Sequence, residues 1–104
     1  MKNKLSIFIE PVFSFLKTIP MGMVATYSLV AKEVGLKSPR NIGWILKQNN
    51  TPDIIPCYKV VRSNGKLAEG YKFGGKEEQQ RRLENEGIRF NEKGKIINFK
   101  NLVT

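Results

Sequence analysis

The residue best suited to covalent chemistry is the single cysteine, Cys57, which lies between Pro56 and Tyr58. A thiolate is a good nucleophile, but a cysteine with the ordinary pKa of about 8.5 is only about three per cent ionised at pH 7. Losing all activation would therefore cost roughly 2 kcal/mol in thiolate population, which slows a thiol without disarming it. Free cysteine is also common as a small buried apolar residue, so Cys57 on its own does not establish a reaction.

The chain contains no histidine. A Cys/His zinc site therefore cannot be assembled from it, and one cysteine cannot form an internal disulfide. We expect a cytoplasmic protein that uses no metal and no other cofactor. No apolar run approaches the roughly 20 residues needed to span a bilayer, and the start at residues 1–4 does not resemble an export signal, so no membrane partner is expected.

The charge of the chain is strongly positive. Eighteen Lys and Arg residues against nine Asp and Glu give the 104 residues a formal net charge of +9. A field of this size favours a polyanionic partner such as nucleic acid. A basic surface kept for solubility, or a thermophilic bias toward Lys and Glu, is the alternative.

Three short helices are predicted before the cysteine. Apolar residues at helical spacing predict the first over 7–18. The second ends at Gly35, and the third has Pro39 at its first position, where a missing N–H is harmless. The expected N-caps of the three helices are Ser6, Thr26 and Ser38.

The second and third helices, joined by a tight turn, are typical of a helix-turn-helix. Ile42 and Ile45 would face the core, whereas Arg40, Trp44 and Lys47 share the opposite face of the third helix. That exposed face is the predicted DNA-reading surface.

Short β-branched segments then predict a small β wing around a turn at 63–65. A polar helix is predicted over 76–86, ending at Gly87, and a second hairpin is predicted within 88–99. The fold class expected for a single domain over 1–104 is mostly α with a small β wing, a winged helix-turn-helix. The first wing strands are expected at 54–56, 58–61 and 66–67.

Several segments occur in an order typical of one protein family. Residues 55–61 are similar to the Pro-Cys-His-Arg-Val motif of the O6-alkylguanine-DNA alkyltransferases. Residues 19–27 resemble the family's Ile-Pro-x-Gly-x-Val-x-(Ser/Thr)-Tyr, and residues 40–43 resemble its Arg-x-Val-Gly. The resemblance covers about residues 6–88 and lacks the amino-terminal ribonuclease-H-like domain that many members carry. Shorter matches lie at 62–65, 70–71, 74–75 and 83–87.

The resemblance implies a DNA-repair protein that binds double-stranded DNA containing O6-alkylguanine through the minor groove and flips the damaged base out of the stack. Cys57 would take the alkyl group irreversibly, in a single turnover without a cofactor. Tyr27 would crowd the target phosphate and donate a hydrogen bond to the leaving guanine, and Arg40 would fill the space in the stack. Without the motif, Tyr27 would be read as a core aromatic and Arg40 as a solvated cation.

The same resemblance and the charge of the chain suggest further site residues. Tyr71 in the loop 70–75, Pro56, and Asn49, which would hold the turn leading to Pro56, are expected at the substrate pocket. Additional DNA contacts are expected from Asn41, Trp44, Lys47, Lys59 and Arg62.

Tyr58 is the main departure from the family, which has a histidine there that takes the cysteine proton through a water, with a glutamate behind it. Glu86 corresponds to that glutamate, although it could be a helix-end carboxylate paired with Arg82. The Tyr58 hydroxyl could hold a water or hydrogen-bond the sulfur, and Lys59 could recover part of the thiolate population. On the resemblance, Tyr58 and Glu86 join Cys57 and Tyr27 as candidate catalytic residues.

Two other functions are consistent with the sequence. A non-enzymatic alkyltransferase-like sensor would bind and flip alkylguanine and flag it for excision, although such proteins usually replace the cysteine. A winged-helix transcription factor would explain the helix-turn-helix and the charge, but not Pro56-Cys57. A monomer is expected, with a nuclease or excision-repair protein as a possible partner.

Overall fold

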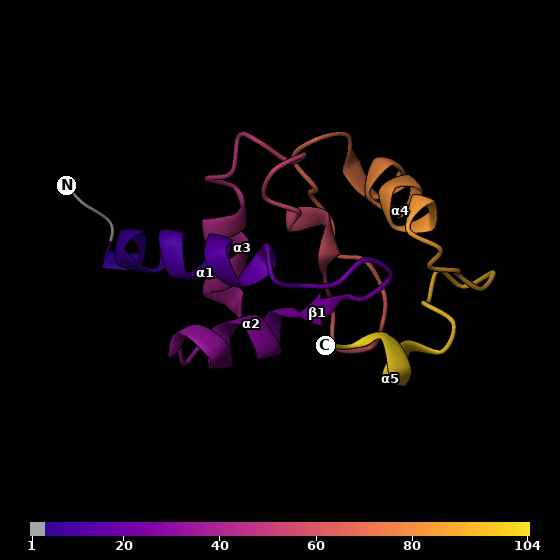
Figure 1. The fold of residues 1–104 in the computed structure, drawn as a ribbon, viewed down its shortest axis with the longest axis horizontal. Coiled ribbons are helices and arrows are strands. Elements are labelled where there is room, and N and C mark those ends of the chain that lie inside the picture. Colours follow the sequence, from indigo (N-terminus) through magenta and orange to yellow (C-terminus); the bar gives the residue numbers. More distant parts are fainter. Residues whose placement is uncertain (1–3) are drawn as a thin grey trace.

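Three helices and the segment leading into them form the larger part of the core. The computed structural model describes residues 4–104, so residues 1–3, on which the expected lack of an export signal partly rests, lie outside the described residues. A 3-10 helix η1 (Lys4–Phe8) leads into α1 (Ile9–Leu16), followed by α2 (Tyr27–Val34) and α3 (Arg40–Leu46). Figure 1 shows these helices packed together at one end of the molecule. Their fully buried side chains include Val12, Leu16, Val30, Ile42 and Ile45.

The second helix has the predicted ends. The Thr26 hydroxyl accepts a hydrogen bond from the backbone N–H of Leu29 at 3.0 Å, and Gly35 ends the helix with a left-handed φ of 82°. Such a φ costs glycine little because it has no Cβ. Thr26 and Gly35 are confirmed as the cap residues of α2.

The other two predicted caps are wrong. Ser6 lies inside η1, and α1 begins only at Ile9, after Phe8. Ser38 makes no side-chain cap, because Pro39 precedes α3 directly. The contribution of Ser38 is its backbone carbonyl, which accepts the N–H of Asn41 at 3.2 Å.

The sheet differs from the predicted wing. Strand β2 (Val60–Val61) pairs in parallel with β1 (Ala25–Thr26), with Ala25 opposite Val60, and not with the predicted strand at 66–67, where Lys66 bridges Lys95 instead. Residues 54–56 are not a strand because the Thr51 carbonyl accepts the N–H groups of both Ile54 and Ile55, which closes a turn. The turn at 63–65 does form, since the N–H of Arg62 donates to the Lys66 carbonyl at 2.9 Å.

A second core lies beyond the sheet. Helix α4 (Gly75–Asn85) is followed by Gly87, as predicted, and the second hairpin is present as an antiparallel bridge between Phe90 and Ile96. A short helix α5 (Phe99–Leu102), which was not predicted, brings Val103 beside Val24 in a parallel bridge. The carboxyl-terminal segment is therefore packed onto the domain. Within residues 4–104, no helix is both long enough and apolar enough to cross a membrane.

Lys59 ties the two cores together. Its side chain is only 3% exposed, and its ammonium donates to the carbonyls of Ile19 at 3.2 Å and Pro20 at 2.7 Å. It also pairs with Oε1 of Glu86 at 2.9 Å, and that oxygen accepts the N–H of Gly22 at the same distance. Lys59 is thus a buried structural cation, and its predicted contact with DNA is wrong.

The burial of Lys59 has a local cause. Residues 57–59 form the 3-10 helix η2 (Cys57–Lys59). A 3-10 helix has three residues per turn, so its consecutive side chains leave in different directions. Cys57 and Lys59 therefore face different parts of the molecule.

The alternative pairing of Glu86 with Arg82 does not occur. Arg82 instead bonds to Oδ1 of Asp53 at 3.1 Å and to Oε2 of Glu78 at 3.0 Å. Glu86 instead pairs with Lys59 and accepts hydrogen bonds from the turn at Gly22 and from Tyr58.

Glu86→Gln should reduce the loss of stability in acid. Burial alone would raise the pKa of Glu86, but hydrogen bonds from Tyr58 and Gly22 and the ion pair with Lys59 outweigh it and hold the pKa below its usual range. A lowered folded-state pKa contributes stability that is present above the unfolded value, about 4.3, and is lost as the pH falls. Urea unfolding between about pH 6 and pH 3 should therefore show a steeper loss for the wild type than for Glu86→Gln.

The same substitution should cost about 3 kcal/mol at pH 7, because it leaves the Lys59 ammonium buried without a counter-charge. Glu84→Gln, an exposed change near the end of α4, is the matched control and should behave as the wild type. Parallel pH profiles for Glu86→Gln and the wild type would contradict this account of the ion pair.

Candidate active site

Cys57 lies at the start of η2 with its side chain only 5% exposed. The sulfur accepts a hydrogen bond from Nδ2 of Asn49 at 3.2 Å, and the same amide nitrogen donates to the Ile55 carbonyl at 2.8 Å. Oδ1 of Asn49 accepts the N–H of Thr51 at 2.9 Å. The fully buried Asn49 thus bridges the turn between α3 and Cys57, at the place expected from the sequence.

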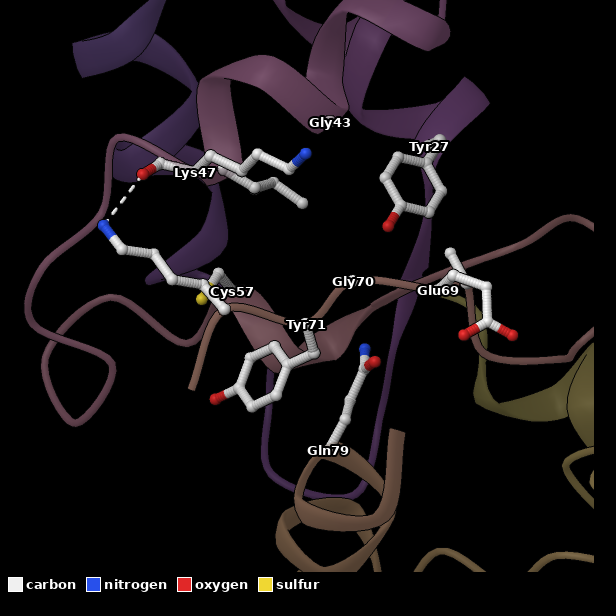
Figure 2. A pocket seen from close by; sticks show the side chains of 11 residues that line it. Tyr27, Gly43, Lys47, Cys57, Glu69, Gly70, Tyr71 and Gln79 are labelled. Carbon is white, nitrogen blue, oxygen red and sulfur yellow. Dashed lines mark hydrogen bonds between the residues drawn. The ribbon is translucent and has the colours of Figure 1, made fainter. Parts of the chain in front are cut away.

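A pocket of about 460 Å³, including its open mouth, lies in front of the sulfur. Figure 2 shows the Cys57 and Tyr27 side chains on different sides of this space, with Tyr71 below it. Its walls come from α2, α3, η2, the loop before α4 and α4 itself. The lining residues are Tyr27, Gly43, Leu46, Lys47, Cys57, Ala68, Glu69, Gly70, Tyr71, Lys72 and Gln79.

The surroundings of Cys57 keep its thiol protonated. Burial raises the pKa of the Cys57 thiol. The hydrogen bond from Asn49 and the charges of Arg82 and Lys72 lower it, but do not outweigh burial. Cys57 is therefore well positioned at the pocket. A smaller fraction of its thiol is ionised to thiolate than in an exposed cysteine.

Tyr27 begins α2, so its position depends on the Thr26 cap and the strand before it. Burial and the neighbouring Cys57 raise its pKa, while Arg62 opposes the rise. The hydroxyl therefore stays protonated near neutral pH and is available as a hydrogen-bond donor in the pocket.

Tyr58 faces away from this pocket. Its hydroxyl donates to Oε2 of Glu86 at 2.5 Å, and the Arg82 guanidinium lies 5.8 Å from the centre of its ring. Burial and the hydrogen bond to the Glu86 carboxylate raise the pKa of Tyr58 far above its usual value. The expectation that this hydroxyl reaches the sulfur is wrong, because the carboxylate is the better acceptor.

Tyr71 holds an unpaired hydroxyl. Its oxygen is buried, yet it has no hydrogen-bond partner among residues 4–104. Burial and the neighbouring Cys57 raise the pKa of Tyr71 to about 12, so the group remains a donor. Buried polar groups are nearly always hydrogen-bonded, so an unpaired donor in a pocket marks a place for a ligand or a water.

The predicted reading face of α3 is present beside the pocket. Arg40 and Lys47 are exposed, and Trp44 is half-buried with part of its ring packed against the core. These three residues line a shallow hollow that also contains Tyr27. Asn41 is half-buried on the same helix.

Two other predicted residues lie elsewhere. Arg62 is exposed after β2, at the turn 63–65. Pro56 does not line the pocket of Cys57; it lies with Tyr58 and Glu86 in a separate hollow. Its place in the substrate pocket is a wrong prediction, because its carbonyl turns back to accept the N–H of Lys59 and start η2.

Lys72 and Gln79 were missed from the sequence. The Lys72 ammonium donates to the carbonyls of Lys47 at 2.9 Å and Asn49 at 3.1 Å, which ties the loop before α4 to the end of α3. Gln79 is buried, and its amide donates to the carbonyls of Tyr58 and Val60. The sequence analysis selected only Tyr71 from the loop 70–75, and nothing in the polar run of α4 singles out Gln79.

The comparisons with known proteins agree with this geometry. Residues 7–88 match the family model described as 6-O-methylguanine DNA methyltransferase, DNA binding domain. The chain is 46% identical over 80 residues to a bifunctional methyltransferase/endonuclease of Picrophilus torridus. This match covers 76% of this chain and 26% of that protein. It is 44% identical over 73 residues to a methylated-DNA–protein-cysteine methyltransferase of Pyrobaculum aerophilum, and that match covers 70% of this chain and 47% of that protein. This chain thus spans from about a quarter to about half of these relatives.

A solved structure matches the whole chain. Atl1 of Schizosaccharomyces pombe, in complex with damaged DNA containing O6-carboxymethylguanine, superposes with a TM-score of 0.80 at 27% identity. The match covers 100% of this chain and 98% of Atl1. The expected fold class, mostly helical with a small sheet and winged-helix-like, is confirmed. The chain belongs to the 6-O-methylguanine DNA methyltransferase family, whose DNA-binding domain it comprises.

Proposed function

We propose that this domain repairs double-stranded DNA by flipping O6-alkylguanine into the pocket and moving the alkyl group onto Cys57. The observation that carries the proposal is the sulfur itself, held at the pocket by the Asn49 amide at 3.2 Å. A cysteine that served only as packing would need neither a pocket in front of it nor a buried amide bonded to it.

The reaction is a direct displacement. The Cys57 thiolate attacks the alkyl carbon, so a carbon–sulfur bond forms as the bond from that carbon to O6 breaks. The electron pair remains on the guanine, where a hydrogen bond from Tyr27 stabilises the developing charge. The thiol proton leaves to water, because Tyr58 is bonded to Glu86 and no histidine is present.

The reading face presents the cations for the DNA backbone. Arg40 and Lys47 are exposed on either side of Trp44, next to the mouth of the pocket. By the family resemblance this helix enters the minor groove, where sequence is read poorly, which suits a protein that must follow damage. The name of the Picrophilus torridus relative supports a nuclease as a fused or recruited partner.

A second function is favoured by one comparison. The fold superposes with a TM-score of 0.80 on Atl1, which is named an alkyltransferase-like protein. A sensor that binds the flipped base without reacting would also tolerate the absent histidine. The retained Cys57 at the pocket favours transfer over sensing.

Intact-protein mass spectrometry tests the proposal. The protein is mixed with excess duplex oligonucleotide that contains one O6-methylguanine. We expect one added methyl group on the wild type and none on Cys57→Ala, because the sulfur is the only acceptor. An unchanged wild-type mass with lesion-selective binding would establish the sensor, and binding indifferent to the lesion would exclude both functions.

Tyr71→Phe should slow single-turnover transfer about tenfold without destabilising the fold. The unpaired hydroxyl is free to bond to the sulfur or the bound guanine, and a hydrogen bond to a charged group is worth about 1.5 to 3 kcal/mol. No hydrogen bond is lost in the free protein, so the free energy of unfolding should stay level or rise. Rapid-quench kinetics and urea unfolding provide the two readings.

Tyr58→Phe is the matched control for Tyr71→Phe. It removes a hydroxyl that is bonded to Glu86, so stability should fall by about 1 to 2 kcal/mol. A normal transfer rate in Tyr71→Phe would show that its hydroxyl takes no part in the reaction.

A further inference from the structure

A second basic surface lies outside the pocket and outside the reading helix. A shallow groove runs between the turn 63–65, the start of α4 and the tip of the carboxyl-terminal hairpin. Among residues 4–104, no acidic side chain lines it. Its lining residues are Arg62, Lys66, Leu67, Lys76, Lys93 and Gly94.

The cations of this groove are largely unneutralised. Lys76 pairs with Glu69 at 2.8 Å, and both side chains are exposed. Within residues 4–104, no carboxylate pairs with Arg62, Lys66 or Lys93. Three unpaired cations around one hollow form a site of positive potential, which an anion would stabilise.

The hairpin that supplies Lys93 is fixed in place. The N–H of Ile96 donates to the Gly65 carbonyl at 2.9 Å, and Lys66 lies opposite Lys95 in an antiparallel bridge. Oδ1 of Asn91 accepts the N–H groups of Lys93 at 2.9 Å and Lys95 at 3.0 Å, which holds the tip of the hairpin in shape.

The groove continues the DNA-facing surface. Leu67 lines the groove, and the next two residues, Ala68 and Glu69, line both the pocket of Cys57 and the hollow that contains Arg40 and Trp44. The hairpin lies beyond residue 88, where the family model ends. The hairpin therefore adds cations to this surface that the residues matched by the family model do not supply.

We propose that this groove binds the sugar-phosphate backbone of the duplex beside the flipped nucleotide and lengthens the DNA footprint of the domain. The inference rests on the proposed function, since it assumes that the pocket faces DNA. Phosphate contacts position a protein without reading sequence, which is what a lesion-directed protein needs.

The salt dependence of binding tests this surface. Dissociation constants for an undamaged duplex are measured over a range of salt concentrations for the wild type and for the double variant Lys66→Gln/Lys93→Gln. Each phosphate contact contributes about 0.9 to the slope of log K against log salt, so the double variant should lose about 2 from the slope. Lys4→Gln/Lys17→Gln, which removes two exposed lysines from the ends of the first helical segment, is the control and should keep the wild-type slope.

The outcomes separate the two proposals. A wild type that binds neither this duplex nor one that contains O6-methylguanine would overturn the proposed function. A wild type that binds, together with a groove variant whose slope equals that of the control, would overturn the groove alone and leave an acidic protein as its other possible occupant.

Discussion

The buried contact between Lys59 and Glu86 holds together the three segments on which the site depends. Lys59 belongs to η2, which also carries Cys57, while Glu86 follows α4. Both bond to the turn 19–22 that leads into β1 and Tyr27. A buried ion pair adds little net stability over apolar packing, but losing one partner is costly. Its value here lies in fixing where the nucleophile and Tyr27 stand relative to each other.

That contact also determines the chemistry available to Cys57. Glu86 accepts bonds from Lys59, Gly22 and Tyr58, so we infer that its carboxylate supports the scaffold and moves no proton from the sulfur. The Tyr58 position therefore serves the scaffold. What remains on the pocket side of η2 is a protonated thiol bonded to Asn49, with two tyrosine hydroxyls that can donate to a bound base. On the proposed function, such a site would carry out a single slow displacement and would not regenerate its nucleophile.

Some local signals in the sequence predicted the structure correctly, although the caps expected at Ser6 and Ser38 did not form. Thr26 begins α2 with a side-chain hydrogen bond, and Gly35 ends it with a left-handed backbone. The turn 63–65 depends only on its glycine, Gly65, and on the residues next to it. The order of the family motifs also brought Cys57, Tyr27, Tyr71 and Asn49 to one place. These residues share the pocket or touch the sulfur directly.

Contacts between distant segments could not be predicted in the same way. The pairing of β1 with β2, and of Val24 with Val103, joins residues far apart in the chain and has no local signature. Lys59 was misplaced because its neighbour Cys57 is in the site, whereas a 3-10 turn sends the two side chains apart. Pro56 was misplaced for the same reason. Adjacency in the sequence identified residues near the site, but it did not show on which side of the turn each side chain lies.

The titration of Cys57 tests most directly whether Tyr58 and Glu86 are scaffold and not relay. The rate of iodoacetamide alkylation of the DNA-free protein, followed by intact mass from about pH 6 to pH 10, reports the thiol pKa. The structure predicts an inflection above the ordinary value of about 8.5, because burial raises the pKa of Cys57, and the same inflection in Tyr58→Phe. An inflection near or below neutrality that Tyr58→Phe moves upward would show that a relay through Tyr58 exists.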